Sequence, residues 1–249
     1  MVVLTVEDFP MVFTTSPTSD YEFTLEHRPA YASLVVNLKP NQKIIVEAGA
    51  MAAMDSHIQL QSKTRGGLGQ SLARMLAGES LFLSEFTAQQ RAGKIYISPG
   101  VTGDICHYYL DGNQSLFIQS AGFVACSPTV ELQTQWQGMS KGFFSGESFF
   151  LIQAVGRGDV WFSSYGGIVE IPIEGGYIID TGYIVAFEDS LAYRVEILGG
   201  LSVRALGVAV FGGEGWVCRF RGTGKAWIQS RELNNLLNFL NPFRPVKSD

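Results

Sequence analysis

The sequence predicts an all-β protein built from three tandem antiparallel repeats, on the strength of three observations. The chain has 249 residues with 28 Gly, and only 16% of its residues are charged. Runs of Val, Ile, Leu, Phe and Tyr recur roughly every 8–12 residues between Gly, Pro, Asn and Asp, a spacing typical of a β-sandwich or barrel. A set of motifs also occurs three times in the same order. Together these features predict one β-rich domain with roughly six to eight strands per copy.

The composition excludes several classes of protein. Low charge and abundant aromatic residues argue against intrinsic disorder. The net charge is −5, and only 18 residues are Lys or Arg, too few for a protein that binds nucleic acid through a basic patch. The longest apolar stretches, Tyr177–Phe187 and Leu206–Gly213, are shorter than the roughly 20 residues that a transmembrane helix needs. We therefore expect no nucleic-acid partner and no transmembrane segment.

The termini and the cysteines give expectations about location. Residues 1–20 have no basic segment and contain Glu7 and Asp8, so they are expected to be a tail and not a signal peptide. Three widely spaced cysteines among apolar residues, Cys106, Cys126 and Cys218, suggest buried free thiols and a cytoplasmic protein.

Three motifs define the repeats, and each occurs once per copy. A Gly-Glu pair before apolar residues occurs at Gly78–Phe82, Gly146–Phe150 and Gly213–Val217. A Gly before a β-like run occurs within Ala92–Ser98, Arg157–Ser163 and Thr223–Gln229. A third block, preceded each time by a turn and a short β-like run, occurs at Glu47–Ala53, Gln119–Ala125 and Asp180–Ala186. The constant order at nearly constant spacing indicates internal triplication.

The predicted boundaries follow from these motifs. We expect a single β domain over residues 21–241, with an N-terminal tail at 1–20 and a C-terminal tail at 242–249. The repeats are expected at about 21–104, 105–167 and 168–230, followed by a helix at 231–241. Runs such as Ser33–Leu38, Lys94–Ser98 and Tyr193–Leu198 are the expected strands, and glycines are expected to mark the bends between strands.

Two segments have helical periodicity. Leu68–Leu76 places apolar residues at helical spacing after Gly66-Gly67. Near the C-terminus, Ser230 is a candidate cap for a helix that ends at Pro242 and carries a stripe of Leu233, Leu236, Leu237 and Leu240. We expect both stripes to pack against the β-structure, and a partner-binding or membrane-surface helix is the alternative.

Several of these motifs resemble those of the altered-inheritance-of-mitochondria protein 24 family. The matching segments are Glu47–Met51, Gly78–Phe82, Asp180–Gly182 with Val185–Phe187, and Gly222–Gly224 with Ile228–Arg231. The resemblance extends from about Tyr21 to Arg231. It implies a fold similar to the tryptophan RNA-binding attenuator protein (TRAP-like), with antiparallel units of double-stranded β-helix type about a pseudo-threefold axis. Eukaryotic members of the family are linked to mitochondrial inner-membrane organisation, and the family supplies no catalytic residues.

A search for chemistry yields no catalytic residue, cofactor or metal site. His27, His57 and His107 are isolated in the sequence. On a strand, Asp104 and Cys106 would share one face and His107 would point away, which is poor ligand geometry. The segment Gly146–Phe150 lacks the final Gly of a nucleophile elbow, and the Gly-rich turn before Leu68 lacks the Lys of a phosphate-binding loop.

Two sets of equivalent polar residues leave alternatives open. Glu79, Glu147 and Glu214 could meet as three carboxylates, or each could accept backbone hydrogen bonds in a local bend, and we favour the local role. The other set is Glu47, Gln119 and Asp180, one of which is an amide. Since an amide and a carboxylate share an acceptor oxygen, this set suits a repeated backbone hydrogen bond.

The aromatic doublets and the absence of a catalytic motif set the functional expectation. Phe143-Phe144 and Phe149-Phe150 each present one ring to either face of a strand, so they are expected in the core or at an oligomer or partner surface. We expect a non-enzymatic scaffold or protein-interaction protein, with self-association into a homo-oligomer possible. The alternative is a small-molecule-binding module with ligand sites between repeats or subunits.

Overall fold

The computed structural model describes residues 18–63, 82–135, 151–198 and 216–244, and these are almost entirely β-structure. Every pairing between strands in these ranges is antiparallel. One short α-helix follows the last strand. The prediction of an all-β fold with large antiparallel sheets is therefore confirmed.

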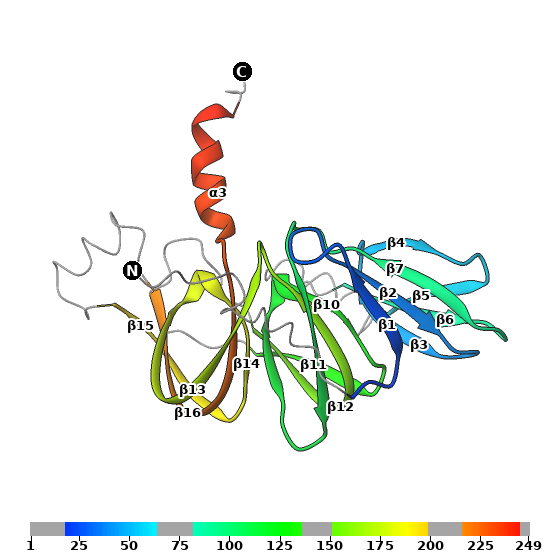
Figure 1. The fold of residues 1–249 in the computed structure, drawn as a ribbon, viewed down its shortest axis with the longest axis horizontal. Helices are drawn as coiled ribbons and strands as arrows, with labels where there is room; N and C mark the ends of the chain where they lie inside the picture. The colour runs from blue at the N-terminus through cyan, green and yellow to red at the C-terminus, as the bar shows by residue number, and fades with distance from the viewer. Residues whose placement is uncertain (1–17, 64–81, 136–150, 199–215, 245–249) are drawn as a thin grey trace, which may run out of the picture.

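The strands form three groups that lie in a row, from the N-terminal group at one end of the molecule to the C-terminal group at the other (Figure 1). The N-terminal group contains β1 (Glu22–Glu26), β2 (Ser33–Leu38), β3 (Lys43–Glu47), β4 (Met51–Met54), β5 (Ile58–Lys63), β6 (Leu83–Ala88) and β7 (Gly93–Ile97). The middle group contains β8 (Ile105–Asp111), β9 (Leu116–Gln119), β10 (Phe123–Cys126), β11 (Val130–Gln135) and β12 (Leu151–Ser163). The C-terminal group contains β13 (Ile168–Asp180), β14 (Ile184–Glu188), β15 (Leu191–Ile197) and β16 (Trp216–Gln229).

Two sheets run through these groups. A four-stranded sheet has the order β1-β2-β7-β4 and stays within the N-terminal group. A 12-stranded sheet follows the path β13-β16-β14-β9-β12-β10-β3-β6-β5, with β8, β11 and β15 branching from it. The larger sheet therefore links all three groups by backbone hydrogen bonds.

The long strands change partners at a glycine bend. Strand β12 pairs with β9 and β11 along its first half and with β8 and β10 along its second half. At the bend, Gly156 has a φ of +110°, and a Cβ there would lie 2.6 Å from the carbonyl oxygen of Thr129. Strand β16 has Gly222 at its own bend, with a φ of +117°. Because only glycine adopts such angles without strain, these two positions behave as the sequence predicts.

The core consists of three hydrophobic clusters that interlock. Trp161 of the middle group is fully buried in the cluster of the N-terminal group. Ile45 of β3 and Trp227 of β16 join the cluster of the middle group. Phe117 of β9 and Leu151 of β12 pack in the cluster of the C-terminal group. Each group therefore completes the core of a neighbour, so apolar faces are buried between groups as well as within them.

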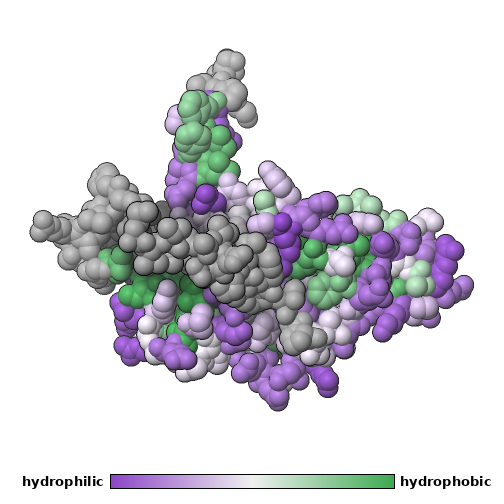
Figure 2. Space-filling model, in the orientation of Figure 1, coloured by the Kyte–Doolittle hydropathy of each residue, from purple (hydrophilic) through white to green (hydrophobic). Residues whose placement is uncertain are grey.

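The C-terminal helix differs from the prediction in its cap and its packing. Helix α3 spans Leu233–Leu240 and is followed by the 3-10 turn η4 at Asn241–Phe243. Its N-cap residue is Glu232, while the Ser230 hydroxyl accepts a hydrogen bond from the Gly167 amide at 2.9 Å. The helix has no buried residue and projects away from the sheets (Figure 1), with apolar side chains along its surface (Figure 2). The prediction that this stripe packs on the β-structure is therefore wrong for the described part of the chain.

Other predictions have varied outcomes. The three cysteines are free and buried, as expected. The predicted helix at Leu68–Leu76 and the doublets Phe143-Phe144 and Phe149-Phe150 lie outside the described residues. No helix within the described ranges is long and apolar enough to cross a membrane.

Closure about a threefold axis would need a contact between the first and last groups, and no pairing between described strands joins them. The threefold repeat and its axis stay predictions.

Candidate functional site

Two strand-to-strand junctions join the three groups, and they share one geometry. At the first junction, Ala125 and Cys126 of β10 pair with Val46 and Ile45 of β3. At the second junction, Ala186, Phe187 and Glu188 of β14 pair with Ile118, Phe117 and Leu116 of β9. In both, the strand before a three-residue turn pairs with the strand after the next such turn along the chain.

At each junction, an apolar side chain of the strand before the turn packs in the core of the neighbouring group. Ile45 does so at the first junction, where it packs in the cluster of the middle group. Phe117 does so at the second junction, where its ring lies 5.0 Å from that of Phe187 in a stacked arrangement and 5.8 Å from that of Tyr193. We call Ile45 and Phe117 the crossing residues, because each packs in the hydrophobic cluster of the neighbouring group.

A polar contact closes the second junction. The Ser115 amide and hydroxyl both donate to one carboxylate oxygen of Asp189, at 2.9 and 2.7 Å, and the Asp189 amide donates to the Ser115 carbonyl at 3.1 Å. Gln153 donates to the Ser115 hydroxyl at 2.8 Å. The junction thus combines an apolar centre with a satisfied polar border.

One recurring hydrogen bond was not predicted from the sequence. In each group, the donor is the backbone amide of the residue that follows the glycine of the second repeated motif. The acceptor is a polar side chain at the end of, or just after, the strand that follows the three-residue turn. The donors and acceptors are Lys94 to Asp55 at 2.8 Å, Asp159 to Ser127 at 2.8 Å, and Lys225 to Glu188 at 2.9 Å. The acceptors are Asp, Ser and Glu, so the contact is hard to find by eye as a repeated letter.

The set Glu47, Gln119 and Asp180 only partly fits the predicted backbone contact. Asp180 accepts a hydrogen bond from the Gly182 amide at 2.8 Å and caps the turn η3 (Thr181–Tyr183). Gln119 makes no side-chain cap at the corresponding turn η2 (Ser120–Gly122). Burial of Glu47 raises its carboxyl pKa to about 7. The prediction of one contact repeated three times is therefore wrong, because only Asp180 makes it among the described residues.

The second set of acids cannot be placed in the same way. Glu79, Glu147 and Glu214 lie outside the described residues. Whether they form a carboxylate site or local contacts stays a prediction.

A buried polar cluster lies between the N-terminal segment and the middle group. His107 and Asp159 are both fully buried, with the His107 Nε2 atom 2.7 Å from Asp159 Oδ1. The Asp159 carboxylate also accepts from the Ser19 hydroxyl and, at 2.9 Å, from the Asp20 amide. The His107 ring packs against Phe23 with centroids 4.7 Å apart. This cluster fastens residues 19–20 to the middle group.

The arrangement is not that of a Ser-His-Asp triad. Both Ser19 and His107 bond to Asp159, so no bond joins the serine to the imidazole as nucleophilic catalysis requires. The other imidazole nitrogen, His107 Nδ1, is buried and has no hydrogen-bond partner in the described structure. The geometry fits a structural role, in which the carboxylate accepts from residues 19–20, from His107 and, at 3.4 Å, from the Ser127 hydroxyl.

Asp104, Cys106 and His107 have different surroundings in the structure. Asp104 forms a bidentate pair with Arg28, with Nε to Oδ1 at 2.7 Å and a second contact at 2.9 Å. Cys106 packs in the middle cluster, whereas His107 contacts rings on the other face of β8. No group of three His, Cys, Asp or Glu residues suited to a metal occurs among the residues that the structure describes.

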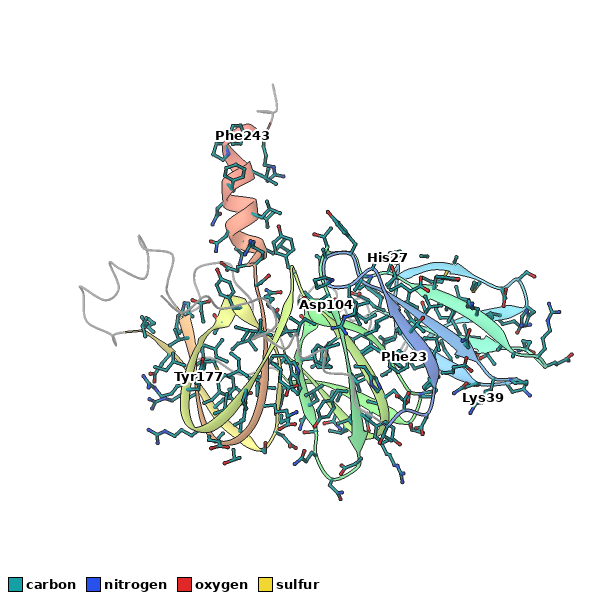
Figure 3. All side chains as sticks on the ribbon, in the orientation of Figure 1. Phe23, His27, Lys39, Asp104, Tyr177 and Phe243 are labelled. Carbon is teal, nitrogen blue, oxygen red and sulfur yellow. The ribbon has the colours of Figure 1, made fainter. Side chains whose placement is uncertain are left out.

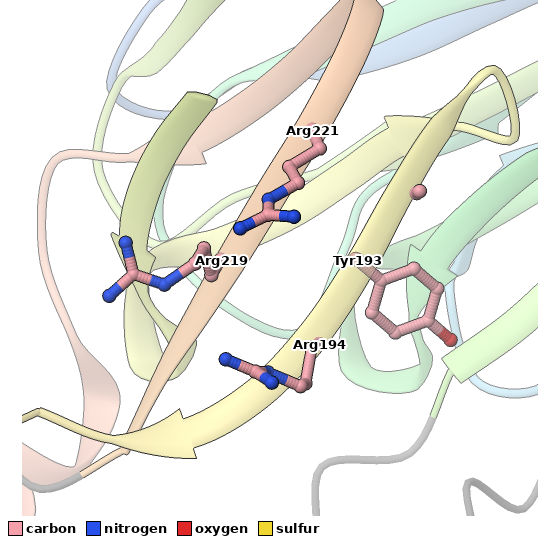
Figure 4. A pocket seen from close by; sticks show the side chains of 5 residues that line it. Tyr193, Arg194, Arg219 and Arg221 are labelled. Atoms are coloured by element: carbon pink, nitrogen blue, oxygen red, sulfur yellow. The ribbon is translucent and has the colours of Figure 1, made fainter. Parts of the chain in front are cut away.

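An arginine-lined hollow lies on the outer face of β15 and β16 (Figure 4). Its volume is about 180 Å³, and it is lined by Ala192, Tyr193, Arg194, Arg219 and Arg221. Arg194 and Arg219 are directly opposite each other across the two strands, and Glu196 accepts from both, at 2.5 and 2.8 Å. These pairs hold the pKa of the Glu196 carboxyl below its usual range. Three cations and one carboxylate leave a net positive surface that could hold an anion.

These features define an all-β protein whose strand groups are joined edge to edge through interlocked cores. The chain belongs to the family described as mitochondrial biogenesis AIM24, whose model matches residues 23–231. It is 25% identical over 236 residues to an uncharacterised protein of Streptococcus pyogenes serotype M6, covering 91% of this chain and 92% of the relative. Its fold is similar to the crystal structure of protein SPYM3_0169 from Streptococcus pyogenes, with a TM-score of 0.74 and 24% identity over 90% of this chain and all of that one.

Proposed function

We propose that this protein is a non-enzymatic scaffold of the AIM24 family, built from three copies of one β unit and acting through surfaces offered to itself or to other proteins. The observation that carries the proposal is the use of the same edge-to-edge junction twice within one chain. A unit that joins its copies in this way is suited to assembly, because each junction leaves a further edge for the next contact.

The threefold repeat is part of the proposal, and three features support it. The side-chain-to-amide hydrogen bond recurs once in each group. The strand after the turn carries a register shift at the same place in each group, between Met51 and Ala53, between Phe123 and Ala125, and between Ile184 and Ala186. Strands β8 and β13 begin at Ile105 and Ile168, where the second and third repeats are expected to begin.

The test is the mass of the purified full chain in solution, measured by size-exclusion chromatography with multi-angle light scattering over a wide range of concentration. We expect a species heavier than one chain. A mass of one chain at every concentration would contradict the self-association on which the scaffold proposal depends. Cytoplasmic residence, proposed from the buried free thiols, is tested separately by cell fractionation.

A second candidate function is the binding of a small anionic ligand in the arginine-lined hollow. Arg221 is exposed at the hollow. Among the described contacts, Glu196 is the only acid that forms ion pairs with the two other arginines of the hollow, Arg194 and Arg219. A thermal-shift titration with inorganic phosphate and with carboxylate metabolites tests this candidate. We expect a saturable stabilisation that is lost in Arg221→Ala and kept in Arg91→Ala, which removes an exposed arginine elsewhere. Equal responses in both variants would exclude the hollow.

A further inference from the structure

Within the described part of the chain, two strand edges at opposite ends of the molecule lack the strand partner that their counterparts have. Strand β4 pairs only with β7 among the described strands, and the segment Tyr177–Ile179 near the end of β13 pairs only with β16 among them. β4 lies at one end of the row of groups (Figure 1), and Tyr177 lies at the other (Figure 3).

These edges correspond to the two sides of the internal junctions. The end of β13 precedes the turn η3, as β9 precedes η2 and β3 precedes the turn at residues 48–50. β4 follows its turn, as β10 and β14 follow theirs. Within the chain, β3 pairs with β10, and β9 pairs with β14. The equivalent third pairing would therefore join the end of β13 to β4.

Burial differs at the two ends in the way a missing junction would produce. All residues of β10 and the first four of β14 are buried, whereas Ala52 and Ala53 of β4 are exposed. Tyr177 and Ile178 of β13 are 44% and 41% exposed, although their counterparts in β3, Ile44 and Ile45, are buried. Exposed apolar residues on a strand edge mark a site for pairing with another strand.

The apolar residues that would form the centre of such a junction are also present, one on the β13 side and two on the β4 side. Ile178 stands where the crossing residues Ile45 and Phe117 stand, two residues before the polar end of its strand. At the second internal junction, the Phe117 ring packs against the rings of Phe187 and Tyr193. Their counterparts in the N-terminal group are Met54, the fourth residue of β4, and Leu60, the third residue of β5, whose exposed fraction is 52%.

We propose that the end of β13 in one copy of this chain pairs antiparallel with β4 of a second copy, in the register of the internal junctions. That register places Ile179 opposite Ala53 and Ile178 opposite Met54, so that Ile178 packs against Met54 and Leu60. The proposal rests on the scaffold function and names its partner as another copy of the same chain.

The geometry of this contact determines the type of assembly. The two edges are different surfaces at opposite ends of one molecule, so the interface is head-to-tail. A head-to-tail interface continues from copy to copy until it closes into a ring or extends as a filament. Every copy then uses both edges, except at the ends of an open assembly.

The test uses two variants of the full chain, each of which disables one edge. Ile178→Glu introduces a carboxylate at the β13 edge and leaves β4 intact, and Leu60→Glu does the reverse. Burying a charge without a partner opposes the contact. We expect each variant alone to have the mass of one chain by light scattering. An equimolar mixture should give a species of two chains and nothing larger, because only one working edge of each kind remains.

Controls separate this inference from the scaffold proposal. Val169→Glu alters another exposed residue of β13, 49% exposed and away from both edges, and should assemble like the wild type. If the wild type assembles and both edge variants assemble equally well, the edge pairing is wrong while self-association stands. A mixture without two-chain species would point to a like-with-like interface and overturn the inference. So would a loss of thermal stability in Leu60→Glu or Ile178→Glu measured at a concentration at which the wild type also has the mass of one chain, since that would mean each chain covers its own edges.

Discussion

Asp159 occupies a position at which the other two groups carry lysine, Lys94 and Lys225, and the buried carboxylate takes part in contacts that those groups lack. It accepts from Ser19, from the Asp20 amide and from His107. Replacing Asp159 by Ala would leave a buried imidazole and a backbone amide without partners. We expect a loss of about 2–4 kcal/mol in the free energy of unfolding, measured with urea.

The control for Asp159→Ala is Glu174→Ala, which removes an exposed acid from β13. Its effect should stay within about 0.5 kcal/mol. Equal effects of the two substitutions would mean that the cluster around Asp159 does not hold the N-terminal segment in place.

Glu47 provides a pH-dependent prediction at the same scale. Burial raises its pKa from 4.5 to about 7, so the folded state favours the protonated carboxyl. As the pH rises from 4.5 to 7, the unfolded chain ionises this group more readily than the folded chain, and stability falls. Glu47→Gln cannot ionise, so its stability should match the wild type below pH 4.5 and exceed it above pH 7. Each pKa unit is worth about 1.4 kcal/mol, so the gain is at most about 3–4 kcal/mol.

Urea denaturation at several pH values measures this difference, with the exposed acid Glu131 replaced by Gln as the control. The control should show no step between pH 4.5 and 7. A constant difference between Glu47→Gln and the wild type at all pH values would contradict ionisation of Glu47 as the cause.

At the scale of elements, the glycine bends allow the long strands to serve two sets of partners. Gly156→Ala would force a Cβ to within 2.6 Å of the Thr129 carbonyl oxygen at a φ of +110°. We expect a cost of about 1–3 kcal/mol in urea denaturation. Gly176→Ala is the matched control, because a Cβ on Gly176 meets nothing within 4 Å. A similar loss in both variants would show that the bend does not depend on glycine.

Helix α3 is the element for which the sequence prediction and the structure differ most. Leu237 on its apolar stripe is 49% exposed, and the helix has no buried residue. Leu237→Glu should therefore change the melting temperature of the β domain very little, since an exposed substitution is worth about 0.5 kcal/mol or less. A marked fall in melting temperature would show that the helix packs on the sheets in solution, as its periodicity predicts.

The elements also show which features a sequence can predict. Repeated glycines and alternating apolar residues predicted the strands, the bends and the all-β class, because these depend on local conformation. The periodicity of Leu233, Leu236, Leu237 and Leu240 predicted the helix but not its surroundings, since an apolar stripe does not specify its partner. The bonds from Lys94 to Asp55 and from Lys225 to Glu188 were missed, because acceptors of different types perform the same role.

At the scale of the whole molecule, the interlocked cores make the three groups depend on one another. Trp161 completes the core of the N-terminal group, and Trp227 completes that of the middle group. Neither group can unfold without exposing a large aromatic side chain of its neighbour, which costs free energy in proportion to the apolar area exposed. The groups are therefore expected to unfold together and not one at a time.

Phe117→Ala tests this cooperativity at the second junction. The half-buried ring packs against Phe187 and Tyr193 of the next group, so its removal should cost about 2–3 kcal/mol, less than for a fully buried phenylalanine. Because the junction couples the groups, the whole domain should melt at a lower temperature in one transition. In differential scanning calorimetry the van't Hoff and calorimetric enthalpies of the variant should then agree, as in the wild type. A separate early transition confined to residues 168–229, detected by hydrogen exchange, would show that the C-terminal group folds independently.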